Sequence, residues 1–335
     1  MSVVDWPLAT RTARRLTRQG PQVSHAEAAE AVAEMREAAV RAHDHVSQVT
    51  GLVATATPEL LVVDRPTWCS ATVESFAELL APLDQRTETS ALSAKVTGLE
   101  VGALLPYLST RVLGQYDPYV GDGPGRLLLV APSIVAVERA LAVDPSDFRL
   151  WVTLHEQTHV LQFLHGPTPW LRDHLRGRIT ALLSEMDLTA GALSGVAANV
   201  ASKLRGRRSE LSLSDLVPDE RAGRLVEEIT AVMSLLEGHA DVIMDEVGPE
   251  VVGTVRTIRA RFTQRRAAGG IDGLVRNLLG LDAKMRQYRD GAAFCRALLA
   301  EVGMDGLNTV FTSPDTLPSA AEIADPQAWL ARVAP

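Results

Sequence analysis

The stretch 144–166 constrains the fold of this chain more than any other. Asp144 is a preferred N-cap residue and Pro145 a preferred first helical residue, so a helix is predicted to begin here. Gly166 and the proline after it are expected to end the helix near Leu164. Large apolar residues fall on more than one side of it, which predicts a helix buried in the core. They are Leu150, Trp151, Leu154, Leu161 and Phe163.

The middle of this helix carries His155-Glu156-Gln157-Thr158-His159. Residues four apart share one face of a helix, so His155 and His159 can bind the same metal ion. Zinc accepts nitrogen, oxygen and sulfur ligands, and two histidines with a third ligand leave a position for water. Glu156 lies one step round the helix, where it is predicted to act as general base toward that water.

Glu237 is the third ligand that the sequence favours. It lies in a helix expected over 219–246, on an apolar stripe where an unpaired carboxylate would be costly, and coordination to zinc would remove that cost. Asp241, one turn further on, is predicted to accept a hydrogen bond from a ligating imidazole. The alternative without a metal is a buried Glu237 paired with an arginine such as Arg224 or Arg256.

Two histidines compete with Glu237 for this place. His165 follows His159 at the spacing of the extended H-E-x-x-H-x-x-G-x-x-H pattern, but Gln162 stands where that pattern has glycine. If the helix continues, His165 lies about 240° round from His159 and points away from the metal. His239 is the other alternative.

A hydrolytic site also needs a donor for the negative charge that develops on the substrate oxygen. His239, Tyr288 and Tyr116 are the candidates. A short apolar run at 127–130 is predicted to be a strand, and as an edge strand it could hold an extended peptide. Cys69 is interpreted as a small buried apolar residue and not as a nucleophile.

Length and composition exclude several classes of protein. The 335 residues contain only two cysteines, too few for a disulfide framework, and the net charge of −8 argues against a grip on duplex nucleic acid. Neither a secretory signal nor an apolar run long enough to span a membrane is present, so a cytoplasmic protein without membrane contact is expected. The oligomeric state stays open.

The overall pattern predicts a mainly α protein with a small sheet, α+β in the wider sense. A mostly helical N-terminal unit is expected over 1–104 and a metal-binding core with C-terminal helices over 105–335. The strands are expected near 60–63 and 126–130. Helices are predicted over 25–45, 71–83, 102–113, 132–141, 144–164, 219–246, 251–266, 272–287 and 290–302.

The sequence resembles an actinobacterial family of zincin-like proteins, described as zinc-dependent metalloproteases or as proteins associated with deazaflavin-cofactor biosynthesis. The resemblance covers nearly the whole chain and lies in eight segments. They are Val4-Asp5-Trp6, Arg11-Thr12-Ala13-Arg14-Arg15, Val62-Val63-Asp64-Arg65-Pro66, Leu113-Gly114-Gln115-Tyr116-Asp117-Pro118, 127–132, 144–163, Pro169-Trp170-Leu171-Arg172-Asp173-His174 and 237–248. It implies a zincin-like fold with His155, His159 and Glu237 on zinc and Glu156 as base. It supplies no substrate.

The leading hypothesis is therefore a zinc metallohydrolase of gluzincin type, most simply a peptidase acting on a peptide or small amide. One alternative is a zinc-binding protein without proteolytic activity that serves an accessory or partner-binding role. A small-molecule amidohydrolase would use the same residues.

Overall fold

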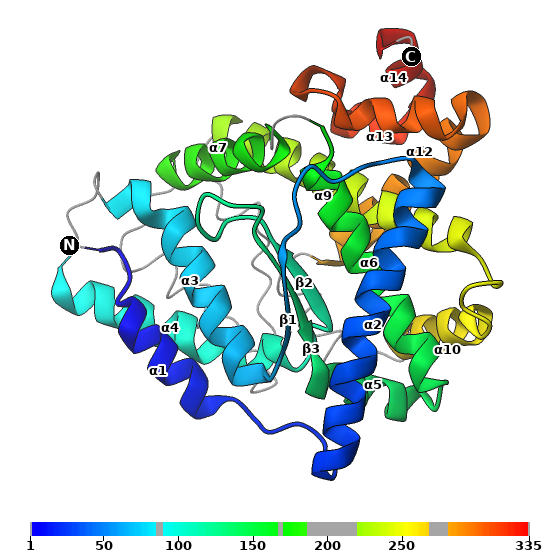
Figure 1. The fold of residues 1–335 in the computed structure, drawn as a ribbon. Coiled ribbons are helices and arrows are strands. Elements are labelled where there is room, and N and C mark those ends of the chain that lie inside the picture. The colour runs from blue at the N-terminus through cyan, green and yellow to red at the C-terminus, as the bar shows by residue number, and fades with distance from the viewer. Residues whose placement is uncertain (1, 85–89, 167–169, 186–219, 268–280, 334–335) are drawn as a thin grey trace.

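The computed structural model describes residues 2–84, 90–166, 170–185, 220–267 and 281–333. Helices dominate these residues, and three short strands form one sheet near the centre (Figure 1). The strands are β1 (Glu59–Val63), β2 (Gly114–Asp117) and β3 (Arg126–Val130). The helices are α1 (Trp6–Leu16), α2 (His25–Thr50), α3 (Arg65–Asp84), α4 (Ala91–Ser109), α5 (Ala131–Leu141), α6 (Pro145–Leu164), α7 (Trp170–Glu185), α9 (Glu220–Val247), α10 (Val255–Ala267), α12 (Leu281–Asn308), α13 (Ala320–Ala324) and α14 (Pro326–Val333). The mainly α fold with a small sheet is thus confirmed.

The sheet has the order β1-β3-β2, with β3 parallel to β1 and antiparallel to β2. The run at 127–130 is therefore the central strand, and its expected role as an edge strand is wrong because both of its sides are already paired. β2 is the edge strand that lies beside α6.

The sheet separates two apolar cores. Successive side chains of a strand point to opposite faces, so Leu128 and Val130 pack with α1, α3 and α4. Leu127 and Leu129 pack into the larger core with α2, α5, α6 and α9. Every residue of β3 is buried, which explains why this strand reads as an unbroken apolar run and not as an alternating one.

The expected division at residue 104 falls inside α4. β1 pairs with β3 across that division, and α2 lies along α6, as Figure 1 shows in blue and green. The two expected units thus share the sheet through β1 and β3, and the larger core through α2 and α6.

α9 and α12 pack closely through two glycines. A Cβ atom added to Gly238 would overlap the backbone of Gly291, and one added to Gly291 would overlap the backbone of Ser234. Only hydrogen fits at these two positions, so the contact fixes how near α9 lies to α12.

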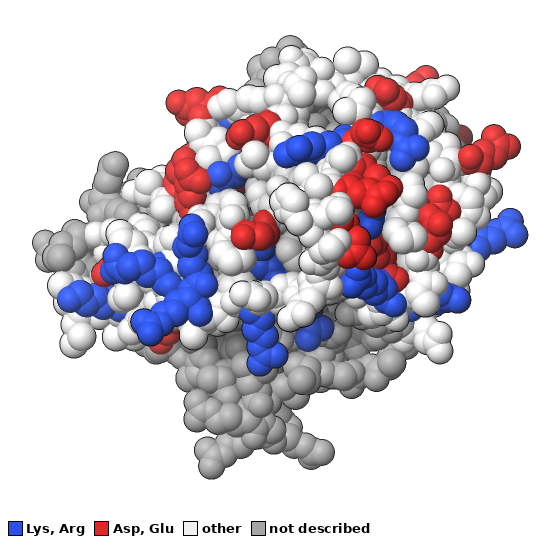
Figure 2. Space-filling view, turned by 60° about the horizontal axis from the view of Figure 1, so that its bottom comes forward, with Lys and Arg blue, Asp and Glu red and all other residues white. Residues whose placement is uncertain are grey.

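Charges of both signs occupy the face shown in Figure 2. Acidic side chains form a band to the right of the centre, and basic side chains gather mainly to the left and below. That face therefore has no single sign of charge. Among the described residues, no helix has both the length and the apolar character needed to cross a membrane.

Candidate metal centre

Local signals at both ends fix the position of α6. The Asp144 carboxylate accepts the backbone N–H of Asp147 at 2.9 Å, and Pro145 occupies the first turn. At the other end His165 is extended and Gly166 has a φ of +88°, which ends the helix. These ends leave the central motif in regular helix, so the histidines one turn apart project from one face.

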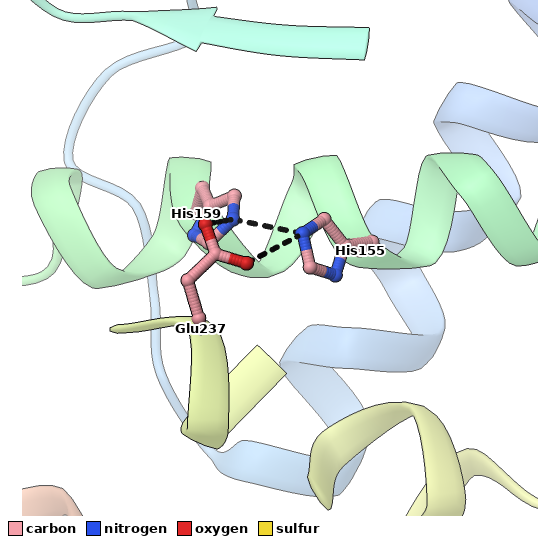
Figure 3. Close-up of side chains that lie close together, drawn as sticks. All are labelled: His155, His159 and Glu237. Carbon is pink, nitrogen blue, oxygen red and sulfur yellow. Dashed lines mark hydrogen bonds and ion pairs between the residues drawn. The ribbon is translucent and has the colours of Figure 1, made fainter. Parts of the chain in front are cut away.

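His155 and His159 from α6 and Glu237 from α9 point toward one another (Figure 3). The two Nε2 atoms lie 3.1 Å apart. Glu237 places Oε2 3.5 Å from His155 Nε2 and Oε1 3.8 Å from His159 Nε2. The three side chains form a possible metal site, with ligand atoms within 4.8 Å of one another.

The spacing and the donor types suit zinc. Ligand atoms around a tetrahedral zinc with bonds of about 2.0–2.1 Å lie about 3.4 Å apart. The observed separations of 3.1, 3.5 and 3.8 Å lie on both sides of that value. Two imidazole nitrogens and one carboxylate are a ligand set that leaves a fourth position open.

Glu156 lies against the edge strand β2, and only 7% of its surface is exposed. Its carboxylate accepts a hydrogen bond from the backbone N–H of Tyr116. Gly114 provides the space, because a Cβ at that position would lie 2.5 Å from Glu156 Cγ. Burial raises the pKa of Glu156 to about 7, and the charge of Glu237 adds to this while His155 and the Tyr116 N–H oppose it.

The two histidines differ in their tendency to hold a proton. Burial disfavours the charged form of His155, but the hydrogen bond and the charge of Glu237 outweigh it and raise its pKa. Burial and the neighbouring His155 lower the pKa of His159.

Gln162 makes contacts that were not predicted from the sequence. Its side chain is buried, and Oε1 lies 2.8 Å from His159 Nδ1. Its Nε2 lies 2.9 Å from the backbone oxygen of Leu236 and 2.9 Å from His239 Nδ1. A polar residue three positions after His159 on a buried helix was the available signal.

Asp241 does not take the role predicted for it. Its carboxylate is 45% exposed and pairs with Arg259 at 2.9 Å and Arg296 at 3.5 Å. No hydrogen bond joins it to His155 or His159 among the described contacts, because one further turn of α9 brings it to the surface. The residue that contacts His159 in this way is instead Gln162.

The structure describes three of the four other candidates. His239 is 0% exposed, so a substrate cannot reach it, and burial together with His159 lowers its pKa to about 3. The Tyr116 hydroxyl donates to the backbone oxygen of Pro124 at 2.6 Å, so only the backbone of Tyr116 contacts Glu156. His165 accepts the backbone N–H of Val53 at 3.3 Å and is not part of the ligand group. The side chain of Tyr288 lies outside the described residues.

The arrangement is of the metallohydrolase type. It consists of two histidines one turn apart on a buried helix, a glutamate from a second helix and an adjacent carboxylate. The chain belongs to the zincin-like metallopeptidase family, which matches residues 4–330. It is also similar to a solved structure from Chloroflexus aurantiacus, described as a candidate hydrolase with a novel fold. The identity is 31%, the TM-score is 0.70, and 99% of each chain is covered. No curated protein matches the chain.

Both findings support a hydrolase, and the family implies a divalent metal, usually zinc. Neither concerns the actinobacterial or the deazaflavin part of the resemblance.

Proposed function

We propose that this protein is a zinc-dependent peptidase of gluzincin type, with His155, His159 and Glu237 as zinc ligands and Glu156 as general base. The observation that carries the proposal is the convergence of three ligand atoms from α6 and α9 beside a buried carboxylate. The family match supports the same class of reaction.

The role of Glu156 follows from its surroundings. A bound zinc ion polarises a substrate carbonyl and makes a water molecule easier to deprotonate. Glu156 is positioned by the Tyr116 N–H and by the space over Gly114, and it would take the proton from a water held beside it. A carboxyl whose pKa lies near the operating pH can then give the proton to the departing amine.

The edge strand β2 supports a peptide as substrate. Within the described sheet it is paired on one side only, with β3, and it lies against the residue proposed as base. An extended peptide can add to such an edge by backbone hydrogen bonds, which would bring a peptide bond close to Glu156.

The decisive variant is Glu156→Gln. We expect it to fold, to hold about one zinc per chain as the wild type does, and to lose hydrolysis of a peptide library by at least about 100-fold. Zinc is measured by elemental mass spectrometry and cleavage by mass spectrometry of the peptides. Cleavage that is unchanged would refute the role of Glu156, and a wild-type protein that binds zinc but cleaves nothing would favour an accessory zinc protein.

Two further variants test the ligand set. Glu237→Ala is expected to lose zinc, whereas His165→Ala is expected to keep it. The opposite result would favour the extended histidine pattern over the glutamate.

A further inference from the structure

Gln162 links the two helices that carry the candidate metal ligands. It lies on α6 one turn after His159, and its side chain is 2% exposed. Its amide contacts His159 on one side, and on the other it contacts α9 at the backbone oxygen of Leu236 and at His239. Leu236 directly precedes Glu237, so the link joins one ligand to the backbone beside another.

The contacts fix which way the amide points. A backbone carbonyl can only accept, so the amide atom 2.9 Å from Leu236 O must be the NH2 group. The second hydrogen of that group faces His239 Nδ1 at 2.9 Å. Both donors are therefore used, and the amide oxygen is the atom that faces His159 at 2.8 Å.

The amide orientation in turn fixes the proton of His159. An amide oxygen only accepts, so Nδ1 of His159 must be the N–H. A neutral imidazole with its proton on Nδ1 has its lone pair on Nε2. That is the atom 3.1 Å from His155 Nε2 and 3.8 Å from Glu237 Oε1.

His239 closes the chain of contacts. Because its Nδ1 accepts from Gln162, its own proton belongs on Nε2, which has no hydrogen-bond partner among the described residues. The ring instead packs edge-on against Phe311, with ring centroids 4.9 Å apart. Because the contact with Leu236 O fixes the NH2 group of Gln162 on this side, His239 Nδ1 can only accept from it.

We propose that Gln162 is a positioning residue of the metal centre: its amide holds the proton of His159 on Nδ1 and ties that ring to α9, so that the Nε2 lone pair faces Glu237 and His155. The proposal rests on the proposed function, since it takes these three side chains as zinc ligands. Hydrogen bonds that orient a ligating histidine contribute about 10- to 100-fold to metal affinity.

The chain provides a matched control on the same helix. Gln157 is also buried, and its amide also lies between a backbone oxygen, Ala39 O at 3.0 Å, and a histidine, His43 Nδ1 at 3.3 Å. It contacts α2 and not a proposed ligand. Gln162→Met and Gln157→Met thus remove similar hydrogen bonds at similar burial.

The experiment measures zinc affinity by competition with a chelator, and the tautomer of His159 by 15N NMR of histidine-labelled protein without metal. We expect Gln162→Met to bind zinc about 10- to 100-fold more weakly and to show both tautomers of His159. Gln157→Met is expected to change neither. Wild-type affinity and a single Nδ1–H tautomer retained in Gln162→Met would overturn the proposal.

Gln162→Glu keeps the proposal testable if the methionine variant does not fold. It retains an acceptor for His159 but loses both donors to α9, so it should keep more zinc affinity than Gln162→Met while losing stability. Equal losses of affinity in the two variants would contradict the tautomer argument. A wild-type protein that binds no zinc would refute the proposed function, while the NMR measurement would still decide the role of Gln162 in setting the tautomer.

Discussion

Two groups of polar side chains centre on α6 and are satisfied in opposite ways. Near the start of the helix, Arg149 pairs with Glu138 of α5 through two bonds, of 2.7 and 3.0 Å, and also with Glu34 of α2. One cation meets two carboxylates there, and the group is complete within the chain.

The second group, in the middle of the helix, consists of His155, His159 and Glu237. Two ring nitrogens and a carboxylate converge at 3.1 to 3.8 Å, and each of these atoms is a type that accepts a hydrogen bond or binds a cation. The group contains no lysine or arginine.

The difference between the two groups shows how a structural cluster of charges can be distinguished from a candidate binding centre. Both groups centre on this one helix. What distinguishes the second group is its surplus of electron-pair donors, which a cation can satisfy.

The largest expected effect comes from removing the cation of the first group. Arg149→Met leaves Glu138 buried without a partner, so we expect the free energy of unfolding to fall by about 3–5 kcal/mol. Urea denaturation measures it, and the zinc content per folded chain should not change. Arg139→Met removes an exposed pair with Glu27 and should cost less than about 1 kcal/mol. Similar losses of unfolding free energy in Arg149→Met and Arg139→Met would contradict the special role of the first group.

The second group should respond to metal where the first does not. Zinc that binds only the folded chain stabilises it by about 4 kcal/mol when free zinc is about 1,000 times the dissociation constant. We expect this gain in the wild type and in Arg139→Met, and its loss in His159→Ala. Thermal unfolding with and without a chelator measures it, and an equal gain in His159→Ala would place the metal elsewhere.

The stability of the metal-free protein is expected to depend on pH because of a carboxyl beside the second group. Folding raises the pKa of Glu156 from 4.5 to about 7, so the folded state prefers the protonated carboxyl. The raised pKa contributes up to about 3 kcal/mol to the free energy of unfolding. This contribution is complete below pH 4.5 and is lost as the pH rises through about 7. Glu156→Gln has no carboxyl to titrate. The unfolding free energy of the variant minus that of the wild type should therefore be larger at pH 8 than at pH 5. A difference in unfolding free energy that does not depend on pH would contradict the raised pKa.

The smallest expected effect tests the position of Glu156. Gly114→Ala would push the carboxylate away, since the new Cβ would lie 2.5 Å from its Cγ. A misplacement of about 1 Å costs about 100-fold in rate, or about 2.7 kcal/mol, while zinc should stay bound. Gly123→Ala is the control, because no atom lies within 4 Å of its Cβ position. Equal cleavage by both variants would show that β2 does not set the place of Glu156.

The sequence was informative where local chemistry decides the structure. The N-cap at Asp144 and the glycine at 166 predict α6 within a residue, and β3 follows from its apolar run. Helix periodicity then placed the two histidines on one face. Glu237 was predicted as the third ligand because a carboxylate on an apolar stripe must be compensated.

Features that depend on tertiary pairing could not be predicted in this way. Gly114–Asp117 has little strand character of its own and becomes β2 only by pairing with β3, so the order of the strands was missed. Asp241 shares a helix face with Glu237, but periodicity does not say where that face leaves the core. Gln162 was noted as a replaced glycine, and its contacts with α9 depend on how the two helices meet.

The close contact between α9 and α12 sets how much variation the metal centre can tolerate. Gly238 directly follows Glu237, and the place of α9 depends on Gly291 of a helix that supplies none of the three ligands. Even a single methyl group at residue 291 would force the helices apart and carry the glutamate with them. A chain of this kind can therefore keep every candidate ligand and still lose their arrangement, through a substitution on an element that carries none of the three.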